Sequence, residues 1–277
     1  MNTILFYGNC QLHALYQIMN KTLKNYNCIS ITCHSIDITE QEFTNTIKNA
    51  SIIITQPISD NYRNLPYLST KYILNNTTAK IIIFPSLYFN FYYVDLKYHF
   101  RNGDLLRIPS DYHYENIIEN YNNNRTYEYY LEHYVNNVNL RSNEELITTA
   151  TNSINELVNR ENEINNDKVN LIKVSDYIRE NYKNKLLFYS MNHPSKYVFQ
   201  YIALKICDLL KLNPANLNLS MDPLRENERG ILYRCIQNVV NFDISIYRPR
   251  LSSGNLEDIH NIYNRYIEIY KTISNKI

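Results

Sequence analysis

Four short polar clusters in this chain contain the residue types that thiol and acid–base chemistry uses. They are Gly8–Gln11, Gln56–Asp60, Pro85–Tyr88 and Asn192–Ser195. The first cluster places a cysteine between two carboxamides, and the last contains a histidine. A thiol and an imidazole that are distant in sequence but adjacent in the fold are the usual pair for nucleophilic thiol chemistry.

Cys10 is the candidate nucleophile. Gly8 permits a tight strand-to-helix turn and a close approach of a ligand to the backbone. We therefore expect Cys10 near a helix N-terminus, where unpaired N–H groups and the positive end of the dipole lower the pKa of a thiol. Asn9 and Gln11 supply neutral amide donors of the kind that stabilise an oxyanion. The alternative is that Cys10 is a small apolar packing residue.

His193 is the candidate base. It precedes Pro194, and proline is favoured at the first position of a helix, so we expect His193 at a strand-to-helix junction. The pKa of an unperturbed histidine, about 6.5, suits a general base near neutrality. The alternative is a helix-capping or loop histidine with no catalytic role.

The elements that must position these residues are predicted from the hydrophobic pattern. Short apolar runs predict strands at 3–7, 28–33, 51–55, 80–84 and 185–189, and helical spacing predicts helices at 11–23, 42–48, 195–211 and 258–273. Strands that are apolar on both faces and alternate with helices indicate an α/β fold with a doubly wound, mostly parallel sheet. Ligands bind at the carboxyl ends of such strands, so we expect all four clusters along one edge.

The domain organisation predicted from these patterns is a single α/β domain over residues 1–277. Between Asp111 and Arg179 the sequence changes to polar helical segments rich in Asn, Glu and Tyr. We interpret residues 111–179 as a helical insertion. The 27 tyrosines and four glycines are interpreted as compositional drift rather than as a sign of function.

Composition and charge exclude several classes of partner. The 28 basic and 27 acidic residues give a net charge of +1, which offers no electrostatic argument for a nucleic-acid partner. No apolar run approaches the roughly 18 residues of a membrane span, so we expect no integral membrane contact. The first eight residues lack the basic region that a signal peptide would have. The five cysteines are irregularly spaced and odd in number, which does not indicate a disulfide framework. A cytoplasmic location is expected.

Other ligand sites have weaker support in the sequence. No G-x-G-x-x-G, G-K-[ST] or G-x-S-x-G pattern occurs, which argues against dinucleotide, P-loop and serine-hydrolase sites. Cys28, Cys33 and His34, with Cys10 and His13, have zinc-ligand chemistry, but no C-x-x-C pair occurs and no metal is expected. Three basic residues near the predicted edge are candidate phosphate ligands or solvated surface residues: Arg63, Lys71 and Lys196.

Several blocks, taken in order, resemble the WcbI family of polysaccharide-biosynthesis acetyltransferases over about residues 3–210. The blocks are Gly8–Gln11, Gln56-Pro57, Tyr62-Arg63, Leu68–Thr70, Phe84–Phe89 and Asn192–Ser195. The resemblance implies an α/β fold distantly similar to SGNH hydrolases, coenzyme A or acetyl-coenzyme A as ligand, and acetylation of a capsular sugar hydroxyl. One departure is Phe91–Asp95, where the family has a Gly and a Pro.

The resemblance also implies roles for individual residues. Cys10, Gln11 and His193 are the expected catalytic residues, with Asn9 and the backbone after Gly8 polarising the thioester carbonyl. His193 would take the proton of the acceptor hydroxyl, and Cys10 either carries the acetyl group or lines the site. The coenzyme-binding residues implied are Gly8, Asn9, Cys10, Gln11, Gln56, Tyr62, Arg63, Ser86, Tyr88, Asn192, His193 and Lys196.

The preferred function is an acyl-coenzyme A-dependent O-acetyltransferase acting on a sugar or polysaccharide hydroxyl. One alternative is an SGNH-like esterase or deacetylase, although Ser190 stands where such enzymes have an Asp three residues before the histidine. The other is a non-catalytic module that binds coenzyme A or a glycan.

Overall fold

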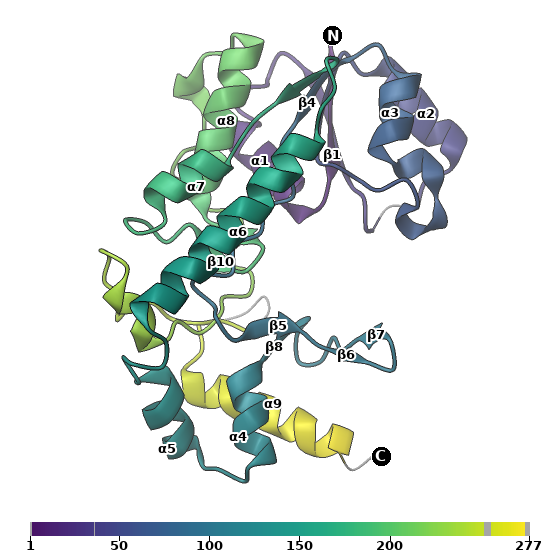
Figure 1. Ribbon diagram of the computed structural model, residues 1–277. Helices are drawn as coiled ribbons and strands as arrows, with labels where there is room; N and C mark the ends of the chain where they lie inside the picture. Colours follow the sequence, from purple (N-terminus) through teal and green to yellow (C-terminus); the bar gives the residue numbers. More distant parts are fainter. Residues whose placement is uncertain (1, 36, 252–255, 275–277) are drawn as a thin grey trace. The chain divides into compact units, whose positions relative to one another are not determined.

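The computed structural model describes residues 2–35, 37–251 and 256–274 and divides into two compact units (Figure 1). The first unit contains residues up to Leu87, Asn155–Arg179 and Pro194–Pro223. The second contains Tyr88–Ile154, Glu180–His193 and the residues from Leu224 onward. The segment predicted as a helical insertion is therefore shared between the units, and the single-domain organisation stays a prediction.

A five-stranded parallel sheet is the centre of the first unit, which confirms the predicted α/β class. Its strands are β1 (Thr3–Gly8), β2 (Asn27–Thr32), β3 (Ile52–Thr55), β4 (Lys80–Ile83) and β9 (Val169–Leu171). Their order across the sheet is β2-β1-β3-β4-β9, and every pair is parallel. The chain extends the sheet on one side of β1 and then on the other. The carboxyl ends of β1 and β3 therefore flank a topological switch point, where ligands bind in such sheets.

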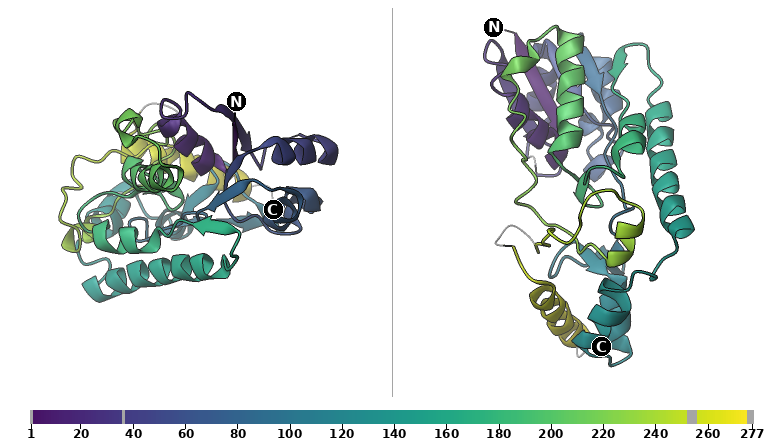
Figure 2. Two further views of the ribbon diagram at one scale, coloured as in Figure 1. Left: turned by 90° about the horizontal axis from the view of Figure 1, so that it is seen from above. Right: turned by 90° about the vertical axis from the view of Figure 1, so that its left-hand side faces the viewer.

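Helices cover both faces of this sheet, as the doubly wound prediction requires. Leu5 and Tyr7 of β1 pack in a core with Phe43 of α2 (Glu40–Asn49) and Ile73 of α3 (Thr70–Asn76). On the other face lie α1 (Cys10–Met19) and α8 (Lys196–Leu210), which contact each other (Figures 1 and 2). Phe6 of β1 meets Tyr16 of α1 with ring centroids 5.3 Å apart.

Helices α2 and α3 begin with side-chain capping, whereas α8 has no side-chain capping bond. Thr39 and Glu42 form a capping box at α2, and the Ser69 hydroxyl accepts the Tyr72 N–H at α3. At α8, Ser195 occupies the N-cap position. Pro194 therefore precedes the N-cap, and the expectation that it opens the helix is wrong.

Two strands differ from the sequence prediction: β9 was not predicted, and the strand predicted at 185–189 does not join the main sheet. Strand β9 lies inside the predicted helical insertion and pairs with β4. It was missed because it has three residues and contains Asn170. Strand β10 (Phe188–Ser190) lies outside the five-stranded sheet and pairs with β11 (His193–Pro194). Three of the four polar clusters therefore follow strands of the main sheet, and Asn192–Ser195 does not.

The second unit is built from short antiparallel strands, helices and buried tyrosines. Strands β5 (Leu96–Tyr98) and β8 (Tyr112–Tyr114) pair with each other, and α4 (Glu115–Asn122) packs against α9 (Ile259–Ser274). The buried Tyr233 hydroxyl donates to Asp95 Oδ2 at 2.5 Å and lies 2.9 Å from the Tyr130 hydroxyl. Burial raises the pKa of Asp95 to about 6. These tyrosines therefore have packing and hydrogen-bonding roles beyond compositional drift.

The aromatic stretch Phe91–Asp95, which departs from the family pattern, is part of this core. The Tyr92 hydroxyl donates to the carbonyls of Tyr182 and Lys185 at 2.7 and 2.8 Å. The Tyr93 hydroxyl donates to the Phe188 carbonyl at 3.0 Å. The stretch thereby holds the segment that leads into β10.

The remaining helices and strands complete the chain. They are η1 (Tyr62–Asn64), η2 (Pro66–Leu68), β6 (Phe100–Arg101), β7 (Asp104–Leu105), α5 (Tyr127–Tyr130), η3 (Leu131–Val135), α6 (Asn143–Glu163), α7 (Ser175–Asn181), η4 (Pro214–Asn216) and η5 (Arg234–Asn238). Among the helices of the described ranges, none is long and apolar enough to cross a bilayer.

Candidate functional site

Carboxamide side chains join the carboxyl ends of β1, β3 and β4. Gln11 donates to the Leu87 carbonyl at 2.9 Å, and its Oε1 accepts the Leu87 N–H at 3.1 Å. The same Oε1 accepts Gln56 Nε2 at 2.7 Å, and Gln56 Oε1 accepts the Asn9 N–H at 3.2 Å. Gln11 and Gln56 are buried. We call Asn9, Gln11, Gln56 and Leu87 the amide relay, and its satisfied bonds hold the three strand ends in one arrangement.

The amide relay changes the interpretation of two predicted site residues. The Gln11 side chain is committed to Leu87 and Gln56, so it positions the site rather than offering a free oxyanion donor. The Asn9 side-chain oxygen caps α1 by accepting the Gln11 N–H at 2.9 Å. A donor from the Asn9 side chain to a ligand must therefore be its Nδ2 group.

Gly8 is needed for close packing, because a Cβ at this position would lie 2.9 Å from Gln56 Oε1 and 2.9 Å from Leu12 Cδ2. Both neighbours are buried. We expect Gly8→Ala to lower the free energy of unfolding by about 1–3 kcal/mol, the usual cost of overpacking. Equilibrium urea unfolding measures this loss.

The control for this prediction is the double variant with Gln56→Ala, which removes one of the two crowded contacts. The double variant should lose less stability than the sum of the single variants, because the sites are coupled through contact. A Gly8→Ala protein as stable as the wild type would contradict the packing role.

Cys10 is the first residue of α1, as expected, and is half-buried. Burial raises the pKa of its thiol, and the backbone N–H groups of Cys10 and Gln11 offset this rise only in part. The expectation of a lowered pKa is therefore wrong in direction, because desolvation exceeds the effect of the helix N-terminus. At neutral pH Cys10 is a thiol.

A cavity of about 340 Å³ opens beside the switch point. It is lined by Asn9, Cys33, Gln56, Pro57, Ile58, Ser59, Tyr62 and Ser86. Four of these residues were predicted as coenzyme ligands: Asn9, Gln56, Tyr62 and Ser86. The structure thus brings together residues from three of the clusters.

Cys33 organises one side of this cavity, a role that the sequence did not suggest. Its thiol donates to the Tyr62 hydroxyl at 3.7 Å, and its carbonyl accepts Arg63 Nη1 at 3.3 Å. Burial raises the pKa of Tyr62 to about 12, so its hydroxyl stays protonated at neutral pH. Arg63 is exposed and has a left-handed backbone with φ of 55°. The guanidinium is thereby held beside the cavity.

Arg160 also reaches the strand ends beside the cavity, whereas Lys71 and Lys196 do not line the cavity. Arg160, which the sequence analysis did not single out, donates from Nη1 to the Ser86 carbonyl at 3.3 Å. Lys71 lies 3.6 Å from Asp60 in an exposed ion pair. Lys196 begins α8, where its N–H donates to Asp222 at 3.1 Å and its ammonium lies 5.5 Å from the Tyr197 ring centroid. The residues described as lining the cavity include neither lysine.

His193 lies in the second unit with a defined ring orientation. Its Nδ1 is 3.4 Å from the Glu228 carbonyl, which can only accept, so Nδ1 carries the proton and Nε2 carries the lone pair. Burial lowers the pKa of His193, so the neutral ring is the form present at pH 7. Since Ser195 is the N-cap residue of α8, His193 does not cap that helix.

Asn192 and Tyr88 are also placed in the second unit. The Asn192 Oδ1 accepts the Tyr112 hydroxyl and, at 3.3 Å, the Ser190 hydroxyl, while Nδ2 donates to Tyr98 at 3.0 Å. Tyr112 also packs edge-on against the His193 ring, with centroids 6.2 Å apart. The Tyr88 hydroxyl donates to Met191 Sδ at 3.0 Å. The contacts of Tyr112 with Asn192 and His193 were not predicted from the sequence.

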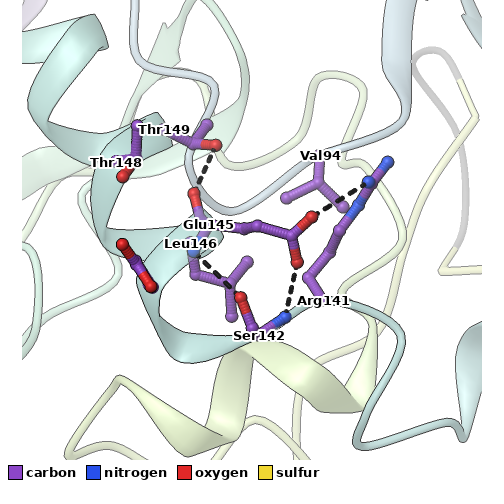
Figure 3. Close-up of a pocket in the computed structure, with 8 residues that line it drawn as sticks. Val94, Arg141, Ser142, Glu145, Leu146, Thr148 and Thr149 are labelled. Atoms are coloured by element: carbon purple, nitrogen blue, oxygen red, sulfur yellow. Dashed lines mark hydrogen bonds and ion pairs between the residues drawn. The ribbon is translucent and has the colours of Figure 1, made fainter.

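A separate cavity of about 480 Å³ contains none of the predicted site residues. It lies at the start of α6, where the Glu145 carboxylate accepts the Ser142 N–H at 2.7 Å and faces Arg141 (Figure 3). These bonds cap the helix, so the polar groups there have a local structural explanation. Within the described ranges, no group of three or more His, Cys, Asp or Glu residues is arranged to hold a metal ion.

Comparisons with known proteins agree with this architecture. The family model described as polysaccharide biosynthesis enzyme WcbI matches residues 3–215. A solved structure of WcbI, described as a native protein without a disulfide bond between coenzyme A and one of its cysteines, has a TM-score of 0.79 at 20% identity. The alignment covers 96% of this chain and 88% of that one, and it shows a shared fold. A search of curated proteins finds no match. Because the family match spans most of its length, the chain belongs to the WcbI family of polysaccharide biosynthesis enzymes.

Proposed function

We propose that this protein is an acyl-coenzyme A-dependent O-acetyltransferase that acts on a sugar or polysaccharide hydroxyl. The observation that carries the proposal is the half-buried thiol of Cys10 at the first position of α1, at the sheet's switch point. Family membership supports polysaccharide biosynthesis, and the coenzyme A named for the related structure supports a thioester donor. Thioester chemistry needs a nucleophile, an oxyanion site and a base.

The cavity beside the switch point is our assignment for the coenzyme A site, with Arg63 and Cys10 adjacent in sequence to its lining residues Tyr62 and Asn9. A phosphate group of the coenzyme would bind the exposed Arg63 guanidinium, which its bond to the Cys33 carbonyl already orients. Tyr62, Ser59 and Ser86 supply hydroxyl groups along the cavity. The thioester end would then lie toward Asn9 and Cys10.

In the first half-reaction, the Cys10 sulfur attacks the acetyl carbon. A new C–S bond forms, the bond to the coenzyme sulfur breaks, and the Cys10 proton ends on the departing coenzyme thiol. The N–H groups of Asn9, Gln11 and Leu12 are bonded to protein oxygens. The Cys10 N–H and the Asn9 Nδ2 group are therefore our assignment for the oxyanion donors.

In the second half-reaction, the acceptor hydroxyl attacks acetyl-Cys10. His193 Nε2 is our assignment for the base that takes the hydroxyl proton as the C–O bond forms. As the C–S bond breaks, a proton ends on the Cys10 sulfur. The Glu228 carbonyl holds the ring in the tautomer that this step needs. The enzyme is regenerated, and the products are coenzyme A and an acetylated sugar.

The direct test is to incubate the protein with acetyl-coenzyme A, with and without sugar acceptors, and to quantify free coenzyme A by chromatography, because transfer of the acetyl group to Cys10 leaves the total number of thiols unchanged. Release of coenzyme A that requires an acceptor supports the transferase. Stoichiometric release in its absence reports acetyl-Cys10, whereas continuous release indicates an esterase. Binding of coenzyme A without turnover for any acceptor identifies a non-catalytic module.

Coenzyme A is expected to raise the melting temperature through Arg63. A ligand that binds only the folded state adds about 2.7 kcal/mol of stability at a hundredfold excess over Kd. Arg63→Gln should weaken coenzyme A binding about tenfold, in the range for a charge-assisted hydrogen bond. Thermal melts and isothermal titration measure both effects.

Arg179→Gln is the matched control, because Arg179 is an exposed arginine of the first unit paired with Asp176 on α7. It removes the same charge away from the cavity and should leave the affinity unchanged. No melting shift at millimolar coenzyme A would contradict the donor assignment.

A further inference from the structure

A cavity of about 780 Å³ in the second unit has no part in the reaction described above. It is formed by the stretch from Leu232 to Arg248, together with Val135, Asn136, Val138 and Ile259. Its volume lies within the usual range for ligand sites. None of the residues predicted from the sequence as catalytic or coenzyme-binding lines it.

Two arginines give this cavity a positive character. Arg234 and Arg248 both line it and are exposed. Among the residues that the structure describes, no carboxylate lies within ion-pair distance of either one. The lining contains one acid, Asp243, whose Oδ1 accepts the Ser245 N–H at 2.8 Å.

Two hydrogen bonds to backbone carbonyls fix the orientation of the Arg248 guanidinium. Its Nη1 donates to the carbonyls of Ser245 and Tyr247, both at 3.1 Å. These bonds use two of the five N–H donors of a guanidinium and fix its plane. An arginine fixed in this way suits bidentate binding of a carboxylate, because little side-chain freedom is lost on binding.

The rest of the lining combines amides and aromatic rings. Asn136 and Asn241 supply groups that both donate and accept, and Phe242 and Tyr247 are half-buried rings. Gln237 is committed to the loop, since Nε2 donates to Phe242 at 3.0 Å and Oε1 accepts from Ile244 at 3.0 Å. Hydroxyl-rich rings with apolar faces match this mixture of amides and half-exposed aromatics.

Tyr247 connects the cavity to the segment that carries His193. Its hydroxyl lies 3.4 Å from the Tyr189 carbonyl and 3.2 Å from the Tyr93 hydroxyl. Tyr189 belongs to β10, which pairs with the strand that contains His193. Tyr247 therefore links the lining of this cavity to the strand pair that contains the proposed base.

We propose that this cavity binds a carboxylated segment of the acceptor glycan, with Arg234 and Arg248 bonded to the carboxylates of uronate-type sugars. The inference rests on the proposed function in taking the acceptor to be a glycan. It adds that the acceptor is acidic and is held away from the acetylated hydroxyl. Two arginines that have no described carboxylate within ion-pair distance, against a single acid in the lining, favour this occupant over a neutral sugar.

The test is direct binding without coenzyme A, so that it does not depend on turnover. The full chain is titrated with tetragalacturonate, with tetramannuronate and with the carboxyl-reduced form of each. We expect one of the uronates to bind at least tenfold more tightly than its reduced form, with an affinity that falls as salt rises. Arg234→Gln combined with Arg248→Gln should abolish this preference.

Arg265→Gln is the matched control, because Arg265 is an exposed arginine of α9 that lies 3.7 Å from Glu257 and does not line the cavity. It should bind as the wild type does. Equal affinity for the reduced forms, unchanged binding by the double variant, or no binding of either uronate at millimolar concentration would each overturn the inference. If the protein acetylates a neutral glycan but does not prefer uronates, the proposed function holds and the cavity inference fails. If it binds uronates but transfers no acetyl group, the cavity inference holds and the proposed function fails.

Discussion

Cys10→Ala should lower the rate of acetyl transfer at least a hundredfold while the protein stays folded. The substitution removes the atom that bonds to the acetyl carbon and disturbs little else, because the side chain is half-buried and alanine is close to it in size. Losses of this size are typical when a positioned catalytic group is removed. The measurements are turnover of acetyl-coenzyme A, the melting temperature and the intact mass after incubation with the donor.

The mass measurement separates carriage of the acetyl group from lining of the site. The wild type should gain the mass of one acetyl group and Cys10→Ala should not. Cys10→Ser should recover little activity, since an alkoxide is much harder to generate than a thiolate. Cys28→Ala is the matched control, because Cys28 is, like Cys10, a half-buried thiol, but it lies on β2 and has no role in the proposed reaction. Near wild-type turnover in Cys10→Ala would reduce Cys10 to a packing residue.

His193→Asn should lower turnover about 10²- to 10⁴-fold and leave coenzyme A binding intact. Asparagine keeps a polar group beside the Glu228 carbonyl but has no titratable nitrogen. In the wild type the rate should fall as pH falls through a single pKa below the usual 6.5, because burial lowers the pKa of His193 and protonation removes the base. Above that pKa the ring is neutral and this dependence disappears.

The residual activity of His193→Asn should lack this acid limb. That readout distinguishes a base from a packing residue, whose loss would lower stability without changing the shape of the pH profile. His260→Asn is the control, since His260 is an exposed histidine of α9. A stable, fully active His193→Asn enzyme would eliminate the base assignment.

Much of the first unit was predictable because its strands have a strong local signal. The apolar runs at β1, β3 and β4 are followed by polar residues, and parallel strands present those residues at one edge. Strand β9 has no such signal: three half-buried residues with Asn170 in the middle do not form a recognisable run. Its place is set by pairing with β4, which is a tertiary contact.

The sequence predicted several residues that lie at the candidate site, but it did not predict what each of them does there. The types and spacing of Gly8, Asn9 and Cys10 pointed to the turn, but the direction of the Cys10 pKa depends on how much protein surrounds the sulfur. The burial of the sulfur depends on packing against segments that are distant in sequence, and a local sequence pattern carries no information on that packing. Likewise the pairing of Gln11 with Gln56 joins residues 45 positions apart, and it makes them positioning residues.

Strand β9 also determines when the sheet can be completed during synthesis. The Asn170 side chain bonds to the Ile81 carbonyl, 89 positions earlier in the chain. Until that segment leaves the ribosome, β4 is an edge strand with an apolar run, the kind of edge on which a second chain can pair. At synthesis rates of 5–20 residues per second these 89 positions take roughly 4 to 18 s, during which the edge stays open. A chain ended before Val169 would therefore keep β4 as an unpaired edge strand, and the complete sheet forms only after residues 169–171 have been made.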